Sequence, residues 1–140
     1  MHVSDESRIA AAQSYIDALV SHDAEAVPFA AGCTRIELGM KNGFSGNHLR
    51  RSLTRGLQYR VIADATPPDY RIDGDEVHAR YDVLSKAALA GRRIAARVTE
   101  TFVIPAESAT GKAEIHHIRV SFTPFISTRI SPCRNLPHAF

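Results

Sequence analysis

The sequence predicts an α+β domain in which three N-terminal helices pack on one face of a curved antiparallel sheet. Two observations lead to this prediction. Apolar residues recur at helical spacing in much of the first 58 residues, whereas from residue 59 onward they alternate with polar residues, as in strands. The strand-like segments are long, and long strands must twist and curl when helices lie across them. We therefore expect a cone-shaped sheet with helices over its opening.

Three helices are predicted ahead of the sheet. The first is expected to begin after Ser4, a good N-cap, and to end near Asp23. Asp23 is expected to cap a short second helix that ends at Phe29. A third helix is predicted over residues 47–58, because leucines recur there at every fourth position: Leu49, Leu53 and Leu57.

One short strand, residues 33–38, is predicted between the second and third helices. The others are separated by Pro and Gly turns and form an antiparallel meander: 59–65, 70–72, 76–88, 92–104 and 113–122. Residues 127–140 contain two prolines and show no periodicity, so they are predicted to be a tail behind a domain of residues 1–126.

Composition limits the classes of function. A chain of 140 residues with 44% apolar residues is of the size of one soluble domain, and a net charge of +2 is too small to predict binding to nucleic acid. There is no apolar run of membrane-spanning length and no leader-like start, so we expect a cytoplasmic protein without a membrane partner. Cys33 and Cys133 lack metal-site spacing, and no metal ion is expected.

The most informative position is Glu100. It lies in the middle of the apolar face of the predicted strand 92–104, between Val98 and Phe102. An ionised carboxylate cannot stay unpaired in an apolar interior, so Glu100 must meet a cation, keep its proton or face a polar cavity. We expect Val98 and Phe102 to line that cavity. Three kinds of partner could neutralise Glu100: Arg35, Arg80 or a histidine.

A histidine pair in the predicted strand 113–122 offers one further candidate. His116 and His117 are adjacent and therefore point to opposite faces, which excludes chelation of a metal ion by this pair alone. His116 shares the parity of Ile118 and Val120 and is expected to face the interior, as a lining residue or as a catalyst.

Three short segments resemble the NTF2-like superfamily, which includes SnoaL-like cyclases and ketosteroid isomerase. Residues 15–23 resemble the end of the superfamily's first helix, residues 31–37 its short first strand, and residues 44–46 the glycine before its third helix. The resemblance covers about residues 5–125. It implies an NTF2-like cone with an apolar pocket, and a homodimer formed by the helix-free face of the sheet, where we expect Tyr81 and Val83.

The resemblance to ketosteroid isomerase implies roles for three residues. Tyr15 falls at the position of a phenol donor, Glu37 at that of the general base, and Glu100 near that of a protonated acid. Each also has a structural interpretation: Tyr15 could lie at the edge of the core with its hydroxyl in water, and Glu37 could pair with Arg35 at the rim of the cone.

The function expected from these residues is that of a cofactor-free isomerase, cyclase or dehydratase. Its substrate would be a small hydrophobic carbonyl compound, for example a polycyclic one, that contacts Arg35, Val98, Phe102 and His116. Two alternatives are open: a non-catalytic ligand-binding protein, and a dimerising accessory module.

Overall fold

The computed structural model describes residues 1–128. One long helix comes first, followed by a hairpin, two short helices and five further strands. In chain order these are α1 (Asp5–Ser21), β1 (Phe29–Glu37), β2 (Met40–Gly43), α2 (Gly46–Arg55), α3 (Leu57–Arg60), β3 (Ile62–Ala65), β4 (Asp69–Asp73), β5 (Glu76–Leu89), β6 (Arg92–Val103) and β7 (Ile115–Ser127).

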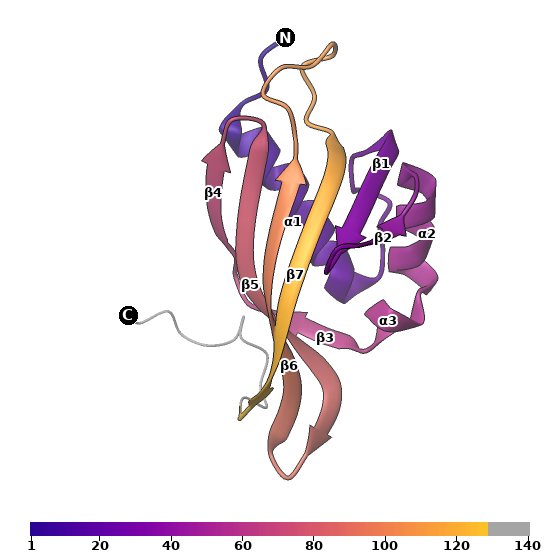
Figure 1. Cartoon of the computed structure of the whole chain (residues 1–140), viewed down its shortest axis with the longest axis vertical. Helices are drawn as coiled ribbons and strands as arrows, with labels where there is room; N and C mark the ends of the chain where they lie inside the picture. The colour runs from indigo at the N-terminus through magenta and orange to yellow at the C-terminus, as the bar shows by residue number, and fades with distance from the viewer. Residues whose placement is uncertain (129–140) are drawn as a thin grey trace.

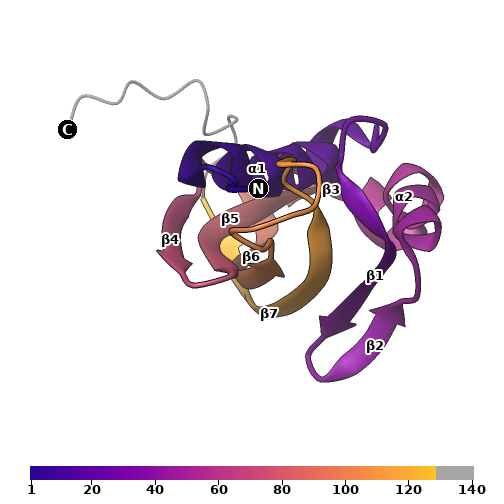
Figure 2. The ribbon, with the colours of Figure 1, turned by 90° about the horizontal axis from the view of Figure 1, so that it is seen from above.

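The strands form one curved, mixed sheet. Its order is β2-β1-β7-β6-β5-β3, and β4 also pairs with β5. All described pairings are antiparallel except that of β1 with β7, which is parallel, so the prediction of a purely antiparallel sheet is wrong at this pair. The sheet curls beneath α1, which lies across its concave side (Figures 1 and 2).

The predicted helices differ from the observed ones in two places. No helix follows Asp23: its carboxylate accepts a hydrogen bond from the Glu25 backbone N–H (3.1 Å), but this closes only a turn before β1 begins at Phe29. The predicted helix 47–58 is divided at Gly56 into α2 and α3. Because β1 and β2 come before α2, the arrangement of three helices ahead of the sheet is not confirmed.

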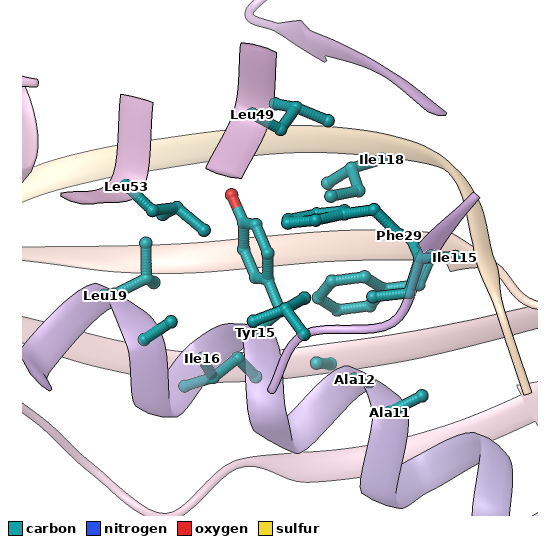
Figure 3. Close-up of a cluster of buried hydrophobic side chains, with 14 of the residues drawn as sticks. Ala11, Ala12, Tyr15, Ile16, Leu19, Phe29, Leu49, Leu53, Ile115 and Ile118 are labelled. Carbon is teal, nitrogen blue, oxygen red and sulfur yellow. The ribbon is translucent and has the colours of Figure 1, made fainter. Parts of the chain in front are cut away.

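Helix α1 buries its apolar face against the sheet. The Ser4 hydroxyl accepts a hydrogen bond from the Ser7 backbone N–H (3.1 Å) and so caps the helix as predicted. At the centre of the buried face, the Tyr15 ring makes edge-to-face contacts with Phe29 and Phe102, at centroid distances of 6.2 and 5.4 Å. Figure 3 shows the Tyr15 ring within this cluster, between α1 and the leucines of α2.

A buried arginine fixes the start of α1 to the sheet. Arg8 is only 2% exposed, and its guanidinium donates hydrogen bonds to the backbone carbonyls of Ile104 (2.7 Å) and Gly74 (2.6 Å). The Ile104 carbonyl lies just after β6, and the Gly74 carbonyl lies in the turn between β4 and β5. The Arg8 side chain therefore links α1 to both of these segments.

The helix-free face of β5 and β6 is mostly polar, apart from a small apolar cluster of Leu84 and Ala95 with Phe125. Tyr81 is directly opposite Val98 in the register of β5 and β6, and both are buried on the inner face, so the prediction that Tyr81 and Val83 lie on the helix-free face is wrong. The outer face of β5 and β6 instead carries charged and hydroxyl side chains: His78, Arg80, Asp82, Arg97 and Thr99. The homodimer stays a prediction, which light scattering would test.

Strand β7 is longer than predicted. It continues through Pro124 to Ser127, so the first residue of the predicted tail belongs to the sheet. The rest of that prediction falls mainly on residues 129–140, which lie outside the described residues.

Candidate functional site

An apolar pocket of about 310 Å³ lies on the inner face of β5, β6 and β7, beside α3 and β1. Aliphatic side chains form most of its wall. The polar and aromatic side chains among the lining residues are Arg35, Glu37, Gln58, Tyr59, Tyr81, Ser85, Glu100 and Phe122. A few convergent polar groups in an apolar pocket are typical of a site for a small molecule.

Glu100 is the buried acid of this pocket. Its side chain is 1% exposed, as the alternation along the strand predicted. Oε1 accepts a hydrogen bond from the Tyr81 hydroxyl (2.6 Å), whereas Oε2 has no hydrogen-bond partner within residues 1–128. Burial raises the pKa of Glu100 from 4.5 to about 7, although Arg35 and the Tyr81 hydrogen bond act in the opposite direction. Glu100 can therefore gain or lose a proton near neutral pH.

Arg35 is the buried cation of the same pocket, and it forms an ion pair with Glu37. Its Nη2 donates to Glu37 Oε1 (3.0 Å), which confirms the pairing considered from the sequence. Glu37 Oε2 accepts a second hydrogen bond, from Asn42 (3.2 Å). Arg35 Nη1 is buried and has no hydrogen-bond partner among the described residues. Arg35 lines the pocket, so the Nη1 group is a hydrogen-bond donor without an acceptor beside the pocket.

The β1–β2 hairpin positions Arg35. Arg35 and Glu37 are two residues apart on β1 and reach the same side of the strand. On the partner strand, Gly43 lies opposite Arg35, and a Cβ atom at Gly43 would be only 2.7 Å from the Arg35 Cβ and 2.5 Å from Leu49 Cδ2. The absence of a side chain at Gly43 allows Arg35 and α2 to pack together.

Tyr15 lies behind the pocket rather than in its wall. It is fully buried, so the alternative of a hydroxyl in water is wrong, and its hydroxyl accepts a hydrogen bond from Arg35 Nε (2.9 Å). Burial raises the pKa of Tyr15 well above its ordinary value, which keeps the phenol neutral. Tyr15 thus supports Arg35, and a different tyrosine, Tyr81, contacts Glu100.

The other predicted ligand-contacting residues fall in different places. Arg35 and Val98 line the pocket. Phe102 is fully buried in the core against Tyr15 and is not part of the lining. The prediction that His116 faces the interior is wrong: its side chain is exposed, whereas His117 is half-buried and hydrogen-bonds to the Thr34 hydroxyl (2.6 Å). The alternation of inward and outward side chains is broken at this point, because Ile115 and Ile118 are three residues apart and both are buried. The pairing of β1 with β7 shifts its register at the same place.

Tyr81, which contacts Glu100, is a pocket residue that the sequence prediction placed on the wrong face of the sheet. A signal for it was available, since Val77, Ala79 and Tyr81 alternate with polar residues and therefore share the buried face of β5.

Two further properties bear on the class of site. In the described part of the chain, no three His, Cys, Asp or Glu side chains are grouped so that they could hold a metal ion. Within residues 1–128, no helix is both long and apolar enough to span a bilayer.

The curved sheet, the helix across it and the pocket define an NTF2-like fold. Solved structures of this class are similar to the chain. A ketosteroid isomerase-like protein from Erwinia carotovora atroseptica is 19% identical, with a TM-score of 0.59 over 89% of this chain and 95% of that chain. A protein of the SnoaL-like family from Agrobacterium tumefaciens is 14% identical, with a TM-score of 0.55 over 84% and 98% of the two chains.

The chain belongs to the family described as "Domain of unknown function (DUF8021)", whose profile matches residues 2–122. No curated protein matches the sequence. A de novo designed protein with a curved β-sheet is also similar, with 11% identity and a TM-score of 0.63 over 86% of this chain and 88% of that chain. Likeness at this level of identity shows the fold, so any argument for function must come from the pocket.

Proposed function

We propose that this protein is a cofactor-free enzyme that moves a proton next to the carbonyl group of a small, largely apolar compound. Isomerisation, cyclisation and dehydration all belong to this class of chemistry. The observation that carries the proposal is Glu100, a buried carboxyl group with a pKa of about 7 in the wall of an apolar pocket. A general acid or base is most effective when its pKa lies close to the working pH.

In this proposal Glu100 transfers the proton. Glu37 was the candidate base in the sequence analysis, but both of its carboxylate oxygens already have partners, Arg35 at Oε1 and Asn42 at Oε2. Glu100 has one hydrogen-bonded oxygen and one buried oxygen without a hydrogen-bond partner in residues 1–128, so in this proposal Oε2 is the atom that exchanges the proton with the substrate. Tyr81 fixes the orientation of the carboxyl group through Oε1.

Arg35 would stabilise the oxygen on which negative charge develops. Its free Nη1 donates towards an anionic oxygen, and in a pocket of low polarity such a donor acts more strongly than in water. Glu37 and Tyr15 hold the other nitrogens of the guanidinium, so the free donor is fixed in place before a substrate binds. In this assignment Glu37 and Tyr15 are positioning residues.

Hydrogen exchange at carbon tests this proposal without knowledge of the product. A panel of apolar cyclic and linear ketones is incubated with the protein in deuterium oxide, and NMR measures the loss of hydrogen next to the carbonyl. We expect catalysed exchange with at least one ketone, and a loss of roughly 100-fold to 10,000-fold in Glu100→Gln. Glu114→Gln, which changes an exposed carboxylate away from the pocket, is the matched control.

Three results would count against catalysis. One is an absence of exchange across the panel, and another is equal exchange by wild type and Glu100→Gln. Saturable binding of a ketone without exchange would favour the ligand-binding alternative.

A further inference from the structure

Two stretches of the sequence combine four or more Lys or Arg side chains with the absence of any acidic residue. Residues 38–63 carry five Lys or Arg side chains, and residues 83–99 carry four. The first stretch includes β2, α2 and α3, and the second forms the β5–β6 hairpin. The chain as a whole has a net charge of only +2, so these stretches concentrate positive charge that is balanced elsewhere.

Six of these cations are exposed and form no ion pair among residues 1–128: Lys41, which lies on the edge strand β2, and five others. Arg97, by contrast, is paired with Asp82 at 3.1 Å. The five others lie on α2, at the end of α3 and along the β5–β6 hairpin: Arg51, Arg55, Arg60, Lys86 and Arg92. Their charge is not neutralised within the described part of the protein.

Large aliphatic side chains are exposed among these cations. Five of them are between 55% and 84% exposed: Leu57, Val61, Leu89, Ile94 and Ile126. Single exposed apolar residues are ordinary, but a group of them marks an interaction surface.

Most of these cations and aliphatic side chains lie towards the end of the molecule formed by α3 and the β5–β6 hairpin, and Arg51 and Arg55 extend the group along α2 (Figure 1). The Lys86 backbone N–H donates to the Val61 carbonyl (2.7 Å), which joins the β5–β6 hairpin to the end of α3. Ile94 and Ile126 are direct partners in the register of β6 and β7. Figure 1 shows the β5–β6 hairpin projecting past α3 and β3 at this end. We call these ten exposed residues, five cations and five aliphatics, the basic-apolar rim.

The basic-apolar rim adjoins the mouth of the pocket. Val61 belongs to the basic-apolar rim and also to the pocket lining, and the same is true of Ile94. A partner bound at this rim would therefore lie next to the opening through which an apolar ligand enters.

The composition of the rim favours one kind of partner. A second copy placed symmetrically on this surface would bring unpaired cations against each other, which is repulsive. Nucleic acid would match the charge, but the aliphatic side chains offer no aromatic face on which bases could stack. A bilayer with anionic lipids matches both components: phosphates and carboxylates for the cations, and the acyl region for the aliphatic side chains.

We infer that the basic-apolar rim docks on an anionic lipid surface, so that the mouth of the pocket faces the bilayer. The sequence led us to expect no membrane partner, because it contains no spanning segment; a peripheral surface assembled from three distant segments gives no such signal. An apolar ligand dissolved in the bilayer could then enter the pocket without crossing water. The docking surface does not depend on the chemistry proposed for Glu100.

Sedimentation with lipid vesicles tests this inference. The full chain is mixed with vesicles of phosphatidylcholine alone or of phosphatidylcholine with phosphatidylserine, and the bound fraction is measured. We expect binding to the anionic vesicles and little to the neutral ones. Binding should weaken as salt concentration rises, since salt screens the exposed cations.

Variants at exposed positions separate the two components of the surface without disturbing the core. Each cation removed should weaken binding about fivefold, so Arg55→Gln and Arg92→Gln together should weaken it about 25-fold. Leu89→Ser should also weaken binding. Two matched controls should bind as wild type does: Lys112→Gln, in the connection between β6 and β7 at the opposite end, and Met40→Ser, on the edge strand β2.

Several outcomes would overturn the inference. These are equal binding to neutral and anionic vesicles, no binding to either, and equal losses in the control and rim variants. Binding of a single-stranded oligonucleotide that is lost in the arginine variants, without vesicle binding, would assign the surface to nucleic acid instead.

Discussion

Replacement of Glu100 by Gln should change how the stability of the protein depends on pH. In an unfolded chain the carboxyl group has a pKa of 4.5, and burial raises it to about 7 in the folded protein. Between these pH values the folded protein holds a proton that the unfolded chain has released, so stability falls as pH rises. The contribution is fully present below the lower pKa and is lost above the higher one.

The size of this effect follows from the two pKa values. They differ by about 2.5, and one pKa unit corresponds to about 1.4 kcal/mol, so wild type should lose about 3 kcal/mol of stability between roughly pH 4.5 and pH 8. Glutamine cannot ionise and is close in shape to a protonated glutamate. Because Arg35 is paired with Glu37, the substitution does not leave the guanidinium without a counter-charge.

Urea denaturation of both proteins across this pH range measures the effect. The difference in free energy of unfolding, Glu100→Gln minus wild type, should rise from near zero at low pH to about 3 kcal/mol in favour of the variant at about pH 8. The profile of Glu114→Gln should run parallel to that of wild type. A loss of about 3 to 5 kcal/mol in Glu100→Gln at neutral pH would show that Glu100 is half of a buried ion pair and would refute the reasoning.

Three further predictions concern the stability of two variants and the reactivity of one buried thiol. Tyr81→Phe should destabilise the fold by about 1 to 3 kcal/mol in urea denaturation, and the pH range of the Glu100 effect should move upward, because a hydrogen bond that lowers the pKa of Glu100 is lost. Arg8→Met should destabilise by roughly 3 kcal/mol in the same assay, since it removes the donors for two backbone carbonyls; a loss below 1 kcal/mol would contradict this. Burial raises the pKa of Cys33 to about 12, so in a Cys133→Ser background a thiol reagent should modify Cys33 only as fast as the protein unfolds; rapid modification of the folded protein would show that Cys33 is accessible.

Local alternation was enough to find the central residue of the site. Glu100 is inward because its neighbours at two-residue spacing are inward, and this depends on β6 alone. The pairing of Arg35 with Glu37 could be considered for the same reason, since both residues lie two apart on one strand.

The parts that could not be predicted depend on pairings between distant segments. The parallel contact of β1 with β7 has no local signal, and the register shift beside it moved His116 out of the interior. The cap signal at Asp23 was real, but the buried side chains of Val27 and Phe29 lead the chain into β1, so packing decided between a turn and a helix.

The parallel pairing of β1 with β7 has a consequence for when the pocket can exist. Arg35 is contributed by β1 and Glu100 by β6, and β7 lies between these two strands in the sheet. On a ribosome, β1 emerges about eighty residues before β7, and it has no strand partner but β2 until β7 arrives. Contacts between such distant segments form late, because a long loop must be closed first. The buried cation and the buried acid are therefore brought together by β7, the last strand among residues 1–128, and a nascent chain that ends before residue 115 has no complete pocket.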